Sequence, residues 1–156
     1  LVMDRWTGEE VDWVNAPRVQ LIDYVAERRV GATRRRFARW CARQTRGNAA
    51  PADSATGRLW RAAESANAKV WRRARREETD AVVEAAALDL PRRLAPAAQL
   101  LTVHACTHAS AEQAAVDAAH MSERWAEFAA ETDSEAAVRR MRQRQVDWFL
   151  DVLRSD

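Results

Sequence analysis

Histidine is rare in this chain, and all three histidines fall within one stretch, 103-VHACTHASAEQAAVDAAH-120. His104 and His108 are four residues apart, which puts both side chains on the same face if the segment is an α-helix. Neutral imidazole is a common metal ligand, so this pair is a candidate metal site. Cys106 lies between the two histidines in sequence and raises the further question of thiol chemistry.

The third histidine weakens the case for a metal centre. If one helix spans residues 97–130, His120 lies about 120° around the helix from His108 and about 18 Å further along it. A break at Ser110 does not bring His120 close either. The pair would then need carboxylates from another helix, and the sequence identifies none. We therefore interpret the histidines as surface or boundary residues and expect no cofactor. A metal-dependent helical enzyme that uses His104 and His108 is kept as an alternative.

The sequence carries no recognisable catalytic motif. Cys106 is two residues from each neighbouring histidine, so on a helix its side chain points nearly away from both and lacks hydrogen-bond reach. There is no GxSxG, P-loop, GxGxxG or HExxH sequence. We accordingly predict no catalytic residue and favour a binding protein over an enzyme.

Arginine supplies almost all of the positive charge, since Lys69 is the single lysine. The arginines form three runs, in residues 34–46, 72–76 and 139–144. Basic runs that contain aromatic residues can contact phosphates and stack on bases. Nucleic-acid binding through the Arg-rich helix 34–46 is therefore an alternative function.

Helical spacing within residues 34–46 favours a different interpretation. Phe37 and Trp40 fit a stripe that faces the core, whereas Arg35, Arg39 and Arg43 fit the opposite side. These three arginines are the candidate partner-binding residues. The net charge of the chain is only +2, so no strong overall field attracts nucleic acid.

An acidic stretch follows the basic ones, between Glu112 and Glu135. The two regions either complement each other inside the fold or form two differently charged surfaces for partners. The sequence leaves both interpretations open.

The elements that position these residues are predicted to be helices. Few glycines and prolines, abundant alanine and no period-2 alternation indicate an all-α fold, and 156 residues fit one domain over 1–156. We expect six to eight helices in an orthogonal or bundle-like arrangement. Capping residues are expected at Thr7, Asn15, Thr33, Asp53 or Ser54, Ser110 and Thr132, with Pro96 in a first turn and an interruption at Thr79-Asp80. The aromatic side chains expected in the core are Trp40, Trp60, Trp125, Trp148 and Phe149.

Cysteine usage and hydropathy bear on location. Cys41 and Cys106 are the only cysteines, which is consistent with two buried thiols in a reducing cytoplasm. No apolar run is long enough to span a bilayer, and the opening residues LVMDRW lack the pattern of a signal peptide. We expect a cytoplasmic protein that does not contact membranes.

Both ends of the chain resemble a known kind of domain. The run 9-EEVDWVNAPRVQLIDYVAERRVGATRRRFARWCAR-43 and the closing helix 142-RQRQVDWFLDVL-153 are similar to an uncharacterised Ala-rich helical domain of GC-rich bacteria. Some relatives of that domain are labelled putative immunity proteins. The resemblance implies a small, non-enzymatic bacterial protein and assigns no role to any residue. We therefore expect an immunity-like or adaptor module that binds another protein.

Overall fold

The computed structural model describes residues 2–3, 10–28, 32–87 and 94–155. These residues form eight α-helices, so the predicted all-α class is confirmed, at the upper end of the expected helix number. A single 3₁₀ turn, η1, spans Gly47–Ala49. The helices are α1 (Arg18–Arg28), α2 (Thr33–Gln44), α3 (Ala55–Glu64), α4 (Ala68–Glu77), α5 (Thr79–Ala87), α6 (Leu94–Ala105), α7 (Ala111–Ala129) and α8 (Ser134–Arg154). None of these helices is both long and apolar enough to cross a membrane.

The N-terminal region differs from the prediction. Instead of a short helix, residues Val2–Met3 (β1) and Glu10–Val11 (β2) form a two-residue antiparallel ladder, and Thr7 lies outside the described residues. Asn15 does not cap α1, because its side-chain amide donates to a carboxylate oxygen of Asp12 at 2.6 Å. The side chain of Asn15 therefore bonds within a local turn. Asn and Asp side chains often form such turns in place of capping a helix.

Several predicted helix starts are confirmed. The hydroxyl of Ser54 accepts from the backbone of Gly57 at the start of α3, and Ser110 caps α7 in the same way. Pro96 lies in the first turn of α6, where a missing N–H costs little. The chain is interrupted at Glu78, one residue before the expected interruption, and Thr79 and Asp80 instead begin α5.

Two further predicted caps are wrong. Thr33 is the first residue of α2, and its preceding residue Ala32 makes no side-chain cap. At α8 the cap is Asp133, one residue after the expected Thr132, and its carboxylate accepts from Ala136 at 3.0 Å. Asp133 has φ of 44°, a left-handed conformation that aspartate tolerates better than most residues.

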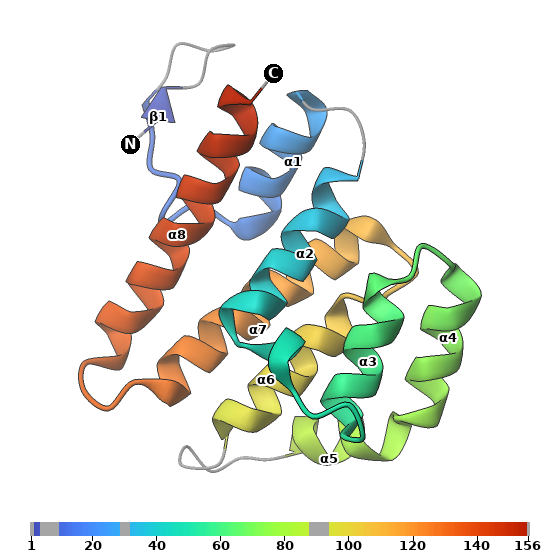
Figure 1. Cartoon of the computed structure of the whole chain (residues 1–156). Coiled ribbons are helices and arrows are strands. Elements are labelled where there is room, and N and C mark those ends of the chain that lie inside the picture. The colour runs from blue at the N-terminus through green and yellow to red at the C-terminus, as the bar shows by residue number, and fades with distance from the viewer. Residues whose placement is uncertain (1, 4–9, 29–31, 88–93, 156) are drawn as a thin grey trace.

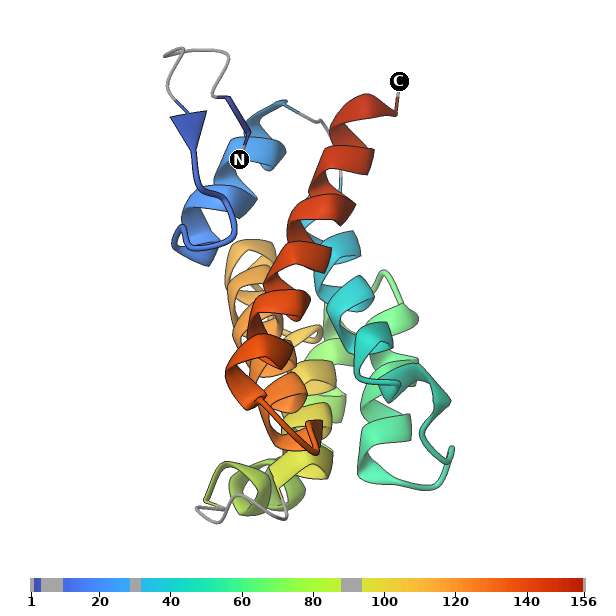
Figure 2. The same ribbon diagram turned by 90° about the vertical axis from the view of Figure 1, so that its left-hand side faces the viewer.

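Helix α7 runs through the middle of the molecule, with α2 and α6 packed along it (Figure 1). Its inner face is alanine, at positions 114, 115, 118 and 119, all fully buried. Small side chains let the neighbouring helices approach closely. Helices α1 and α8 cover one side, and α3, α4 and α5 lie on the other (Figures 1 and 2).

An aromatic cluster joins α2 to α8. Phe37 and Phe149 are both buried, with ring centroids 4.4 Å apart, and Trp148 lies 5.5 Å from Phe37. The expected core aromatics are therefore correct for Trp60 and Phe149, whereas Trp40, Trp125 and Trp148 are only half-buried.

Candidate functional site

The first sequence candidate, the pair His104 and His108, does not share a helix face. Helix α6 ends at Ala105, because the N–H groups of Cys106, Thr107 and His108 bond three residues back rather than four. His108 lies in the following loop, where its Nδ1 accepts from the backbone N–H of Ser110 at 3.0 Å. The assumption of a continuous helix through the HxxxH pair was therefore wrong.

The surroundings of the histidines offer little to a metal ion. His104 is half-buried, and burial, together with the nearby Arg75, lowers its pKa to about 4. His120 is exposed on α7. Across residues 10–28, 32–87 and 94–155, no three His, Cys, Asp or Glu side chains converge on one point. Within these residues no carboxylate joins His104 and His108 in a three-ligand cluster.

Two guanidinium groups bind backbone carbonyls at the end of α6 and in the loop that follows it. Arg35 donates to the carbonyl oxygens of His108 and Ala109 at 2.8 and 2.7 Å, with a longer contact to Cys106 at 3.4 Å. Arg75 donates to the carbonyl of His104 at 3.0 Å. Carbonyls at a helix C-terminus lack intrahelical partners and carry negative partial charge, so cations are stabilising there.

Arg35 also stacks on an aromatic ring. Its guanidinium carbon lies 3.9 Å from the ring centroid of Trp71, which is buried in α4. Burial and the neighbouring Arg39 lower the pKa of Arg35, which marks it as a partly desolvated cation. Arg35 therefore connects α2, α4 and the loop between α6 and α7, and both terminal nitrogens of its guanidinium already donate within the fold.

The other two predicted partner-binding residues are in different surroundings. Arg43 is exposed, with its guanidinium carbon 5.4 Å from the ring of Trp60. Arg39 is half-buried and close enough to Arg35 for repulsion between them. The helix thus places Arg35, Arg39 and Arg43 along one side but leaves only Arg43 well exposed.

A buried charged cluster lies between α1, α7 and α8, and sequence reasoning missed it. Arg18 is 2% exposed and donates to the side chain of Gln145 at 2.9 Å. Arg142 donates to the carboxylate of Glu123 at 2.6 Å. Both arginines also donate to backbone carbonyls between residues 13 and 16. The cluster fastens the segment before α1 to α7 and α8.

Helical spacing could have revealed this cluster. Arg18 shares a face with Leu21, Ile22 and Val25, at the i, i+3, i+4 and i+7 positions of a core stripe. Burial and the nearby Arg142 lower the pKa of Arg18 to about 10. A charged residue within an apolar stripe indicates a buried ion that requires partners.

Both thiols are buried and free, as predicted. Burial raises the pKa of Cys106 to about 12 and that of Cys41 well above its usual range. A protonated, solvent-excluded thiol is a poor nucleophile.

The strongest exposed charge lies on α4, at the outer edge of the molecule (Figure 1). Its sequence, AKVWRRARRE, contains five cations and one acid. Trp71 turns inward and its indole N–H donates to the carbonyl of Ser65 at 2.8 Å, which fixes the helix against the end of α3. The cations around a surface hollow of about 660 Å³ are Lys69, Arg72, Arg73, Arg75 and Arg76.

Three of those cations lack an ionic partner within the described residues. Arg75 is directed to the end of α6, and Arg73 pairs with Glu77 at 2.8 Å. Lys69, Arg72 and Arg76 are exposed and form no ion pair in that part of the chain. They form the cationic face of α4.

Comparison with known proteins adds no assignment: no protein-family model, curated protein or solved structure matches this chain.

Proposed function

We propose that this protein is a non-enzymatic helical module that binds the acidic surface of another protein. The observation that carries the proposal is the cationic face of α4, formed by Lys69, Arg72 and Arg76. The exposed side chain of Val70 adds an apolar contact beside these charges. A partner with clustered carboxylates would complement this surface in charge.

The cationic face is unfavourable for the helix that carries it. Arg72 and Arg76 are four residues apart, and Lys69 is three residues before Arg72, so like charges are neighbours along one side. Lys69 also lies in the first turn, where the helix dipole disfavours a cation. Charges that repel one another in the free protein are stabilised when a partner neutralises them, which supports a binding role.

The orientation of the aromatic side chains favours a protein over a nucleic acid as the partner. Single-stranded nucleic acids stack their bases on exposed aromatic rings. In the two basic helices, Phe37 and Trp71 are buried, and Trp40 packs with its ring centroid 5.9 Å from that of Phe37. Backbone phosphate contact is the remaining route, and the experiment below includes it as an outcome.

The wider proposal is an immunity-like or adaptor protein that works in the bacterial cytoplasm. The resemblance of residues 9–43 and 142–153 to Ala-rich domains with putative immunity relatives supports this role. The buried thiols of Cys41 and Cys106 support a reducing compartment.

Fluorescence anisotropy with two labelled probes tests the proposal: a peptide rich in Asp and Glu, and a short DNA duplex. At about 150 mM salt the contacts of both charged probes are screened. We expect the protein to bind the acidic peptide more tightly than the duplex, because the buried rings of Phe37 and Trp71 leave the duplex only phosphate contacts. The double variant Arg72→Glu, Arg76→Glu should weaken peptide binding by about tenfold or more.

A matched control reverses two exposed arginines on α8, Arg139→Glu and Arg154→Glu, which changes the net charge equally. We expect this control to bind the peptide within about twofold of the wild type. Tighter binding to the duplex would assign the face to nucleic acid. Equal losses in both double variants would show that net charge alone drives binding and would overturn the proposal.

The single variant Arg72→Glu also has an expected effect on stability. It replaces repulsion with attraction toward Lys69 and Arg76. A like-charge pair at this spacing destabilises a helix by roughly 0.2–0.5 kcal/mol, and an opposite-charge pair stabilises it by a similar amount. The variant should therefore be more stable by roughly 0.8–2 kcal/mol while binding less well. Thermal unfolding followed by circular dichroism measures this change, and a less stable variant would contradict the assignment of these charges as mutually repelling.

A further inference from the structure

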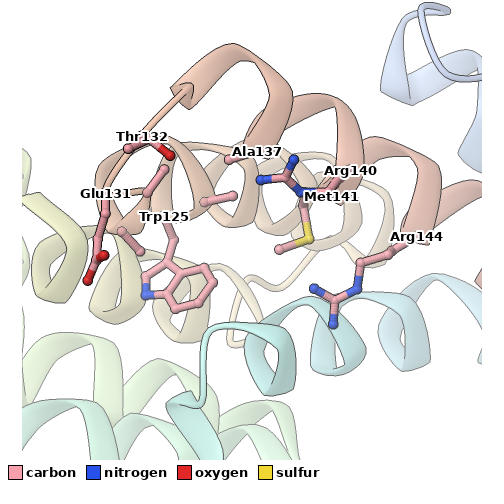
Figure 3. A pocket seen from close by; sticks show the side chains of 10 residues that line it. Trp125, Glu131, Thr132, Ala137, Arg140, Met141 and Arg144 are labelled. Atoms are coloured by element: carbon pink, nitrogen blue, oxygen red, sulfur yellow. The ribbon is translucent and has the colours of Figure 1, made fainter.

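A second surface feature lies where α7 and α8 meet at their connecting turn. A hollow of about 390 Å³ opens there between the end of α7 and the start of α8 (Figure 3). This volume is at the lower end of the range for ligand-binding pockets. The hollow lies far from α4, on the other side of the molecule (Figure 1).

The hollow exists because small residues line the junction of the two helices. Ala126, Ala129 and Ala130 form the α7 side, and Ala137 faces them from α8. Larger apolar side chains at such a junction would normally interdigitate and fill the space. The turn itself is held by the left-handed Asp133, whose carboxylate caps α8.

The lining combines apolar and cationic groups. The half-buried indole of Trp125 and the side chain of Met141 form the floor (Figure 3). Arg140 and Arg144 stand along the α8 side, and Glu131 lies at the far end beyond Trp125 (Figure 3). Arg140 is exposed and has no ion pair within the described residues.

Arg144 is held in place by a neighbouring helix. Its guanidinium donates to the side-chain oxygen of Gln44 at the end of α2. A neutral partner orients Arg144 but leaves its charge uncompensated. The α8 side of the hollow therefore presents two positive charges beside an apolar floor.

We propose that this hollow binds an acidic segment of a partner protein, which inserts one bulky apolar side chain against Trp125 and Met141. A carboxylate on the same segment then lies against Arg140 and Arg144. The two arginines favour a carboxylate on the α8 side, and Glu131 keeps that carboxylate away from the far end of the hollow. Tryptophan and arginine are both enriched at protein-binding hot spots. A hollow this open to solvent suits a side chain anchored by a larger partner, because small ligands need most of their surface enclosed.

The indole N–H of Trp125 provides a local readout. The chain has seven tryptophans, so a ¹⁵N-correlated NMR spectrum shows one indole signal for each, and Trp125→Phe identifies the relevant one. The probe is a short peptide in which Phe and Leu alternate with Asp and Glu. We expect a saturable shift of the Trp125 signal. Two comparison peptides, with Lys in place of the acids or with Ala in place of the apolar residues, should bind about tenfold more weakly or worse.

Two variants test the hollow itself. Ala137→Phe fills it and should abolish the shift, whereas Ala86→Phe, at an exposed position on α5, should leave peptide binding unchanged. Arg140→Glu with Arg144→Glu should weaken binding by about tenfold or more. If Ala137→Phe does not fold, the double variant Arg140→Glu, Arg144→Glu still tests whether the peptide binds in the hollow.

The experiment separates this inference from the proposal about α4. The variant Arg72→Glu, Arg76→Glu should leave the Trp125 shift intact even where it abolishes binding at α4. No shift with the acidic peptide, an equal shift with the Lys peptide, or unchanged binding to both hollow variants would overturn the inference. Equal affinity for free phenylacetate would assign the hollow to a small apolar carboxylate instead of a protein segment.

Discussion

Replacing Arg35 with methionine should destabilise the fold rather than remove a partner contact. Methionine keeps most of the length and apolar surface of arginine but has no donor and no charge. The substitution therefore removes the contacts of the guanidinium while it preserves much of the packing of its aliphatic part against α4.

The expected loss follows from the contacts of that guanidinium. A hydrogen bond from a charged donor contributes about 1.5–3 kcal/mol to the free energy of unfolding. Because Arg35 is partly exposed, we take about 1.5 kcal/mol for each of its short bonds to His108 and Ala109. Stacking over Trp71 at 3.9 Å adds roughly 0.5–1 kcal/mol. Solvent screening and loss of side-chain order reduce the sum, so we expect Arg35→Met to lower the free energy of unfolding by about 3 kcal/mol.

Urea unfolding followed by circular dichroism at 222 nm measures this loss. Arg35→Lys should lower the free energy of unfolding by roughly half as much, since lysine keeps a charge near the end of α6 but cannot reach two carbonyls at once. Arg36→Met on the same helix is the control. Arg36 is exposed and lies 6.0 Å from the ring of Trp148, so its replacement should change stability by less than about 0.5 kcal/mol.

The reasoning fails if Arg35→Met changes the free energy of unfolding no more than Arg36→Met does. That result would mean that water replaces the guanidinium at the three carbonyls without loss. Arg35 would then again be a candidate for binding a partner.

Three further predictions concern buried groups. Gly47→Ala should cost about 1–3 kcal/mol, measured by urea unfolding, because the added Cβ would lie 2.3 Å from the buried Cγ2 of Val103; an equally stable variant would contradict this. His104 has a folded-state pKa of about 4, below that of the unfolded chain, so stability should fall as pH drops from about 6.5 toward 4; His104→Gln should flatten this dependence in unfolding measured across that pH range. Cys41 and Cys106 should not react with a disulfide reagent until urea unfolds the chain, and rapid labelling of the native protein would rule out their burial.

The helix boundaries were predictable where the signal is local. Ser54 and Ser110 each combine a capping side chain with the start of a periodic apolar stripe, and Pro96 fits only a first turn. The N-terminal prediction failed because residues that can start a helix have other uses that the sequence does not distinguish. Asn15 pairs with Asp12, and a backbone ladder forms at Glu10.

The end of α6 could not be placed from the sequence. For this reason the prediction that His104 and His108 share a helix face was wrong. No glycine or proline follows Ala105 to stop the helix. Arg75 of α4 binds the carbonyl of His104 in the last turn of α6. Arg35 of α2 binds the carbonyls of His108 and Ala109 in the loop that follows. An interaction across more than 70 residues leaves no periodic pattern in either segment.

The two Arg-rich helices show why composition alone does not identify a binding surface. Helix α2 packs against α6 and α7, and its aromatic rings meet those of α8, so backbone carbonyls and aromatic rings are within reach of its arginines. Helix α4 lies at the edge and meets the rest of the fold through its inner side, which includes Trp71, Ala74 and Arg75. Arginine therefore stabilises the fold on α2, whereas the arginines on the exposed side of α4 repel one another. The sign of the change in stability distinguishes the two roles of arginine. Replacing Arg35 should destabilise the protein, whereas reversing the charge of Arg72 should stabilise it. Mutually repelling charges such as those of α4 are stabilised when an acidic partner binds them.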